Sequence, residues 1–166
     1  LTPEPPSGSR SMLVIHPGSG SLTKNHPPEF WLRLLDILVQ ASEFRNLIPA
    51  VLLGPAERPL EAFFKKNLGL IKGELYSCLE KKPLTDLLEK ASVYVGHDSG
   101  ITHFSAMLGV PTVALFRRNN AEQWAPLGPL VRVIQSRNSN PGLFDSILKA
   151  AKDLRINLLH HPFALS

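Results

Sequence analysis

Residues 93–103 read VYVGHDSGITH, and residues 109–116 read GVPTVALF. The first apolar run ends in a short polar turn that opens a predicted helix, and the second apolar run follows that helix directly. This order predicts two parallel strands joined by a helix, with Asp98 at the carboxyl end of the first strand. Ligands of open parallel sheets bind at this edge, where free backbone N–H groups and the helix dipole favour an anion.

A second polar turn lies near the start, where residues 16–24 read HPGSGSLTK. Its two glycines permit backbone conformations that a β-carbon forbids, its hydroxyls can donate to an anion, and Lys24 adds a mobile cation. The spacing matches neither the Walker A motif nor the complete dinucleotide fingerprint. A plain Gly/Ser turn with a solvated lysine is the alternative interpretation. Two such turns in one small domain predict a pocket for a phosphorylated ligand.

The rest of the chain alternates short apolar runs with amphipathic helical stretches. This alternation predicts an α/β domain: a Rossmann-like parallel sheet with helices on both faces. The expected strands are Met12–His16, Ile48–Leu53, Glu74–Cys78, Ser92–Val95, Thr112–Phe116 and Val131–Ile134, and the expected helices cover about residues 28–40, 60–68, 83–88, 99–108 and 144–154.

Composition restricts the class of protein. The 166 residues are 43% hydrophobic and 19% charged, as expected of one globular domain. The net charge of +4 is spread evenly, so it predicts no nucleic-acid-binding stripe and permits only mild attraction to anionic ligands or a membrane surface. The single Cys78 excludes an internal disulfide, and no apolar run approaches the ~18 residues of a transmembrane helix.

The chain opens at Leu1 with a Pro-rich segment whose composition is typical of an extended interdomain linker. We therefore expect residues 1–11 to be a linker, residues 12–156 the ligand-binding domain and residues 157–166 a C-terminal tail. We also expect the chain to be the second half of a longer protein.

Several side chains near the expected strand ends have two interpretations each. Glu57 can accept the hydroxyls of a ribose or can stabilise a helix N-terminus. Asp98 can contact a ligand or can cap the following helix, although Ser99 would cap nearly as well. Gly100 weakens the first helical turn, which suggests a close approach to the backbone, and His103 faces the same opening as Ser99.

Three further features are weaker. A zinc site formed by His16, His97 and His103 is conceivable, but no ligand spacing supports it. The Arg117-Arg118 doublet can reach a phosphate or be solvated. A loop around Trp124 is more typical of a structural buttress than of a binding site.

These segments together resemble the C-terminal half of the lipopolysaccharide heptosyltransferase-type enzymes, glycosyltransferase family nine. The resemblance covers about residues 12–135, and the Asp-Ser-Gly block with its context is its most specific part. The matching segments are residues 16–20 with Lys24, residues 52–57 (LLGPAE), residues 83–88 (PLTDLL), residues 95–103, residues 109–116 and residues 124–128 (WAPLG).

The resemblance implies GT-B architecture, in which two Rossmann-like domains face each other and the C-terminal one holds the nucleotide-sugar donor. The implied donor-binding residues are Ser19, Gly20, Ser21 and Lys24 at the diphosphate, Glu57 at the ribose, and Asp98, Ser99, Gly100 and His103 at the donor sugar and phosphate. Transfer in the family inverts the anomeric centre without a bound metal or a cofactor. The general base and the acceptor site would come from an N-terminal domain, so we expect this chain alone to transfer no sugar.

The implied function is transfer from a nucleoside-diphosphate sugar, ADP-heptose, to lipopolysaccharide core or a related surface glycan. The implied place is the cytoplasm, with peripheral contact at the inner membrane. The alternatives are a relative that epimerises or hydrolyses a nucleotide sugar, or a non-catalytic domain that binds one. Two departures bear on the donor: His26 replaces the usual tryptophan, and Arg117-Arg118 replaces a usual Gly-Pro turn.

Overall fold

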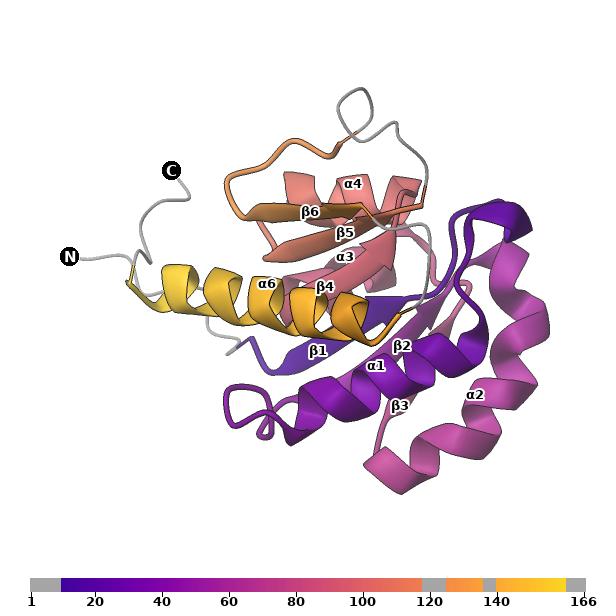
Figure 1. Cartoon of the computed structure of the whole chain (residues 1–166). Coiled ribbons are helices and arrows are strands. Elements are labelled where there is room, and N and C mark those ends of the chain that lie inside the picture. Colours follow the sequence, from indigo (N-terminus) through magenta and orange to yellow (C-terminus); the bar gives the residue numbers. More distant parts are fainter. Residues whose placement is uncertain (1–9, 118–124, 136–139, 161–166) are drawn as a thin grey trace.

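The computed structural model describes residues 10–117, 125–135 and 140–160. They form a six-stranded parallel sheet in the order β3-β2-β1-β4-β5-β6 (Figure 1). The strands are β1 Met12–His16, β2 Ile48–Leu53, β3 Glu74–Ser77, β4 Ala91–His97, β5 Thr112–Phe116 and β6 Val131–Gln135. The α-helices are α1 Pro28–Gln40, α2 Glu61–Asn67, α3 Lys81–Glu89, α4 Gly100–Met107 and α6 Pro141–His160, with 3₁₀ turns η1 Leu22–Lys24, η2 Pro55–Leu60 and η3 Leu68–Ile71.

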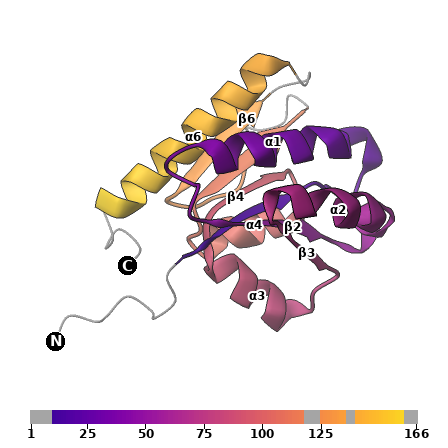
Figure 2. The same ribbon diagram turned by 90° about the horizontal axis from the view of Figure 1, so that it is seen from below.

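The helices cover both faces of the sheet, which confirms the predicted class. Figure 2 shows α1, α2 and α6 on one side and α3 and α4 on the other. Successive side chains of β1 divide between the two layers: Leu13 and Ile15 pack under α1, whereas Met12 and Val14 pack with Leu88 of α3. The four inner strands β1, β2, β4 and β5 read as largely apolar runs because both of their faces are buried, whereas the edge strands β3 and β6 are more exposed and more polar.

The expected strands agree closely with the observed ones, since a buried apolar run bounded by turn residues is a strong signal. The main difference lies in β4, which runs on to His97, so that Asp98 is the first residue beyond the strand. The helices differ more. The helix expected over 60–68 is divided among η2, α2 and η3, and α3 begins two residues before Pro83.

The C-terminal helix α6 extends to His160, so the boundary expected after residue 156 falls within it. Within the described residues no helix has the length and apolarity that a bilayer crossing requires. Four of the features expected from the sequence lie wholly or partly outside the described residues: residues 1–9 of the expected linker over 1–11, Arg118, Trp124, and residues 161–166 of the expected tail over 157–166.

The strand order reverses between β1 and β4. From β1 the chain proceeds outward to β2 and β3, and it then returns to β4 and proceeds the other way to β5 and β6. The loops after β1 and β4 therefore leave the sheet toward opposite faces, and a crevice opens between them at the carboxyl edge. Both polar turns identified in the sequence follow these two strands.

Candidate functional site

A pocket of about 410 Å³ lies at this carboxyl edge. The turn after β1, the turn after β2 and the first turns of α3 and α4 all contribute to it. Its lining residues are His16, Ser19, Gly20, Gly54, Pro55, Ala56, Glu57, Leu84, Ser99, Gly100, Ile101 and Phe104. The pocket thus brings together side chains from four segments that are far apart in the sequence.

The turn after β1 is shaped by glycine and by side-chain hydrogen bonds. Gly20 has φ +73°, a left-handed conformation that glycine adopts without a steric penalty. The Ser19 hydroxyl donates to Asn25 Oδ1 at 2.6 Å, which closes the turn on itself. Ser21 Oγ lies 3.0 Å from Thr23 Oγ1 on the exposed side. The turn therefore presents Ser19 and Gly20 to the pocket and directs Ser21 toward solvent.

Glu57 is 6% exposed, low for a carboxylate. Its Oε2 atom accepts a hydrogen bond from the Gly54 backbone N–H at 3.0 Å, which fixes the carboxylate beneath the turn after β2. A β-carbon at Gly18 would overlap this carboxyl group, so glycine at that position is what lets the two turns meet. Glu57 thus stabilises the turn after β2 and lines the pocket, and its contact to a ribose stays a prediction.

Ser99, and not Asp98, caps helix α4. The Ser99 hydroxyl accepts the Thr102 backbone N–H at 3.2 Å, and Ser99 has the extended backbone typical of an N-cap. The capping interpretation of Asp98 is therefore wrong. Asp98 instead lies 3.6 Å from His103 Nε2, one turn along the helix. The carboxylate can therefore orient the imidazole ring of His103.

A buried hydroxyl network supports the start of α4. Thr102 Oγ1 donates to the carbonyl of His97, and the Tyr94 hydroxyl lies 3.0 Å from Thr102 Oγ1. Gly96 allows this approach, because a β-carbon there would contact both the Tyr94 and Thr102 oxygens. Burial raises the pKa of the Tyr94 phenol, so the group stays protonated and can donate. These contacts fix the helix N-terminus relative to β4.

The three histidines of the zinc alternative have other roles. His16 Nδ1–H donates to the Leu52 carbonyl at 2.8 Å. His97 Nε2 accepts the backbone N–H of His26 at 2.9 Å, and burial lowers the pKa of His97 to about 3. His103 pairs with Asp98. Among residues 10–117, 125–135 and 140–160, no three His, Cys, Asp or Glu side chains form a group able to hold a metal ion.

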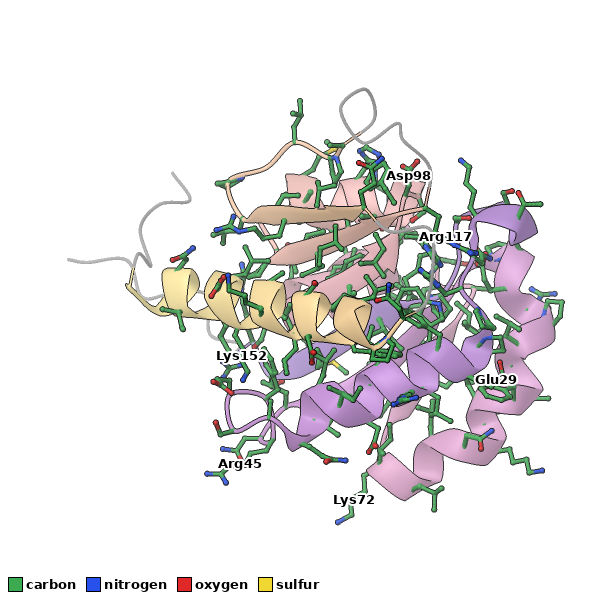
Figure 3. The ribbon with its side chains drawn as sticks, in the orientation of Figure 1. Glu29, Arg45, Lys72, Asp98, Arg117 and Lys152 are labelled. Atoms are coloured by element: carbon green, nitrogen blue, oxygen red, sulfur yellow. The ribbon has the colours of Figure 1, made fainter. Side chains whose placement is uncertain are left out.

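Five of the nine predicted donor-binding residues line the pocket: Ser19, Gly20, Glu57, Ser99 and Gly100. The other four do not belong to its lining: Ser21 and Lys24 lie in the turn after β1, Asp98 directly follows β4, and His103 lies in α4. Figure 3 shows Asp98 at this end of the sheet, above Arg117 and away from Arg45. Their assignment to a donor stays a prediction.

Sequence reasoning missed the apolar part of the pocket. Leu84 from α3 and Ile101 and Phe104 from α4 line it. Their helical spacing indicates a core face, and only the position of the two helices shows that part of this face borders the pocket. Arg117 was also undecided in the sequence. Its Nη1 donates to the Asn25 carbonyl at 2.8 Å, so the structure ties it to the turn after β1.

A parallel sheet with this strand order and a pocket at its reversal point defines a Rossmann-like domain. A family profile described as glycosyltransferase family 9 (heptosyltransferase) matches residues 3–146. The chain belongs to this glycosyltransferase family. No curated protein matches the chain in sequence.

Solved structures share the fold at low sequence identity. ADP-heptose lps heptosyltransferase II of E. coli matches with a TM-score of 0.74 and 17% identity, covering 91% of this chain and 48% of that one. E. coli heptosyltransferase WaaC, solved with ADP, matches with a TM-score of 0.72 and 15% identity over 92% and 47%. A glycosyl transferase family 9 protein from Veillonella parvula matches with a TM-score of 0.69 and 17% identity over 91% and 48%.

The chain therefore spans about half the length of these solved structures. Its fold matches the corresponding half of GT-B heptosyltransferase structures.

Proposed function

We propose that residues 12–156 bind the nucleoside diphosphate of a nucleotide-sugar donor in the pocket at the carboxyl edge. The donor is ADP-heptose, and the activity it serves is inverting sugar transfer to lipopolysaccharide core or a related surface glycan. The acceptor and the general base come from an N-terminal domain, and the reaction takes place in the cytoplasm at the inner membrane face. The observation that carries the proposal is the meeting of two Gly/Ser turns and a buried glutamate in one pocket of a family 9 chain.

The pocket has the two chemical regions that a nucleoside diphosphate requires. Leu84, Ile101 and Phe104 offer an apolar surface for a planar base. On the polar side, the first N–H groups of α4 have no partner within the helix and can donate to an anion in the pocket. Glu57 lies beside the turn after β2, where one carboxylate oxygen can accept ribose hydroxyls while Gly54 N–H holds the other.

In transfer, negative charge develops on the departing diphosphate. Preorganised donors stabilise such charge without reorganising during the reaction. The N-terminus of α4, fixed by Ser99 and the Tyr94–Thr102 network, supplies backbone donors of this kind. Lys24, in the turn after β1, adds positive charge, and so does His103 of α4 when it is protonated. In this proposal no residue of this chain acts as the general base that deprotonates the acceptor.

Lys24→Ala should weaken the binding of ADP more than the binding of adenosine. A charge-assisted contact to phosphate contributes about 1.5–3 kcal/mol, which corresponds to a loss of about tenfold or more in affinity. Adenosine lacks the diphosphate and should lose less than about twofold. Isothermal titration of the 166-residue chain with both ligands measures the difference.

Lys66→Ala is the matched control, because Lys66 is an exposed lysine on α2, which contributes nothing to the pocket lining. It should leave both affinities unchanged. Equal losses for ADP and adenosine in Lys24→Ala would assign Lys24 to the structure of the turn. Failure of the unaltered chain to bind ADP or any of the UDP, GDP and CDP analogues would overturn the proposed function.

Asp98→Asn should lower affinity for a nucleotide sugar while leaving the melting temperature unchanged. Ser99 supplies the cap of α4, so removing the Asp98 charge leaves that hydrogen bond intact. The paired control is Ser99→Ala, which should lose about 1 kcal/mol of stability with the cap. Thermal melts and titrations with ADP-heptose compare the two variants. An unchanged affinity in Asp98→Asn would remove Asp98 from the donor site.

A further inference from the structure

One peptide unit in the turn after β1 is bonded on both sides by side chains from neighbouring strands. The carbonyl of Asn25 accepts from Arg117 Nη1 at 2.8 Å. The N–H of His26, which belongs to the same peptide unit, donates to His97 Nε2 at 2.9 Å. His97 ends β4 and Arg117 follows β5, and these two strands are hydrogen-bonded neighbours.

The ring of His26 strengthens the same attachment. It stacks on His97 with ring centroids 5.3 Å apart and on Phe30 of α1 at 4.1 Å. Phe30 in turn stacks on Phe144 of α6 at 4.9 Å. A row of four aromatic rings therefore runs from β4 through the turn to two helices of the covering layer. His26 is 3% exposed, so water does not compete strongly for these contacts.

The protonation states are consistent with this arrangement. His97 accepts through Nε2 only while it lacks a proton there, and burial lowers its pKa to about 3. Burial, together with the Arg117 charge, lowers the pKa of His26 to about 4. Both rings are thus neutral near pH 7, and the guanidinium remains the only one of the three groups that carries charge.

The turn after β1 is held at both ends. At its start, Gly18 packs against the fixed Glu57 carboxylate. At its end, Asn25 is bonded through its side chain to Ser19 and through its carbonyl to Arg117. Lys24 directly precedes Asn25, so the position of the Asn25–His26 peptide unit sets where the Lys24 side chain begins. A shift of this unit would move the hydroxyl and ammonium groups of the turn together.

We propose that Arg117 is a positioning residue: by holding the Asn25–His26 peptide unit against the ends of β4 and β5, it orders the turn that receives the donor diphosphate. This inference rests on the proposed function. In this inference Arg117 affects the ligand indirectly, through the position of the turn. If the guanidinium instead contacted the ligand itself, removing the guanidinium would leave the turn unaffected.

The test compares the unaltered 166-residue chain with Arg117→Met and Arg117→Lys by two measurements. Amide hydrogen exchange at His26, followed by NMR, reports on the attachment without any ligand. We expect Arg117→Met to accelerate this exchange about tenfold, since it removes a charge-assisted hydrogen bond. Arg117→Lys restores one donor and a charge, and it should recover part of the protection. In Arg117→Met the pKa of His26 should also rise, because a neighbouring positive charge is lost.

The second measurement is binding. Arg117→Met should lower the affinity for ADP about tenfold and the affinity for adenosine less than about twofold. The ADP affinity of Arg117→Lys should lie between those of the unaltered chain and Arg117→Met. Arg45→Met is the control, because Arg45 is exposed at the far end of the molecule (Figure 3). If Arg117 had a purely structural role, Arg117→Met would lower the affinities for both ligands equally.

Two results would overturn the inference. Weakened ADP binding with unchanged His26 exchange would mean that Arg117 contacts the phosphate directly. Accelerated exchange with unchanged ADP binding would mean that the attachment does not serve the site. If the unaltered chain binds no nucleoside diphosphate, the proposed function fails and the ligand role fails with it, whereas the exchange data still decide whether Arg117 holds the turn.

Discussion

Gly18→Ala is expected to destabilise the domain by about 3 kcal/mol and to weaken the binding of both adenosine and ADP about tenfold. The new β-carbon would overlap the Glu57 carboxyl group, which is buried and bonded to Gly54 N–H. Overpacking a tight site costs roughly 1–3 kcal/mol, and a buried group that loses its hydrogen-bond partner costs about 1–3 kcal/mol more. Chemical denaturation and titration with both ligands measure the two effects.

A double-mutant cycle tests the cause. In a Glu57→Ala background the carboxyl group is absent, so Gly18→Ala should have almost no further effect on stability. Gly69→Ala is the matched control, because a β-carbon at Gly69 meets no atom within 4 Å. If Gly18→Ala is equally harmful with and without Glu57, the overlap between the two residues is not its cause.

Trp31→Ala should lower the free energy of unfolding by about 3–5 kcal/mol, the usual cost of removing a large buried aromatic side chain. Trp31 is fully buried in α1, and its ring meets His97 edge to face at 5.0 Å. The cavity would lie directly behind the histidine that accepts the His26 N–H. ADP affinity should therefore fall with stability. Urea denaturation followed by circular dichroism gives the free energy.

Trp31→Phe separates packing from hydrogen bonding. The indole Nε1 of Trp31 is buried and has no hydrogen-bond partner among the described residues, so phenylalanine removes a polar atom without breaking a bond. We expect a loss of less than about 1.5 kcal/mol, since most of the apolar contact remains. A loss as large as that of Trp31→Ala would show that the indole N–H is satisfied in solution.

Much of the fold could be predicted from the sequence because its signals are local. β1 and β2 were located to the residue, since each is an apolar run bounded by Pro or Gly turns. Alternation with amphipathic helices then restricted the class to a parallel α/β sheet. The two Gly/Ser turns were recognised as one prospective site for the same reason: carboxyl ends of parallel strands share an edge. The family followed from the order of these segments, and the matching profile confirms it.

The rest depended on contacts between residues distant in the chain. Ser99 and Asp98 are both suitable capping residues, so the sequence does not decide which of them caps α4. The structure decides it, because the Ser99 hydroxyl lies within hydrogen-bond distance of the Thr102 N–H. Leu84 and Phe104 look like ordinary core residues until α3 and α4 are placed beside the turns.

Arg117 meets the Asn25 carbonyl because β5 ends beside a turn 92 residues earlier in the chain. Local patterns determine which segments are strands, helices and polar turns, because those depend on neighbouring residues. Which side chains meet at the edge of the sheet is a property of the packed tertiary structure alone, because strand order and helix placement set those distances.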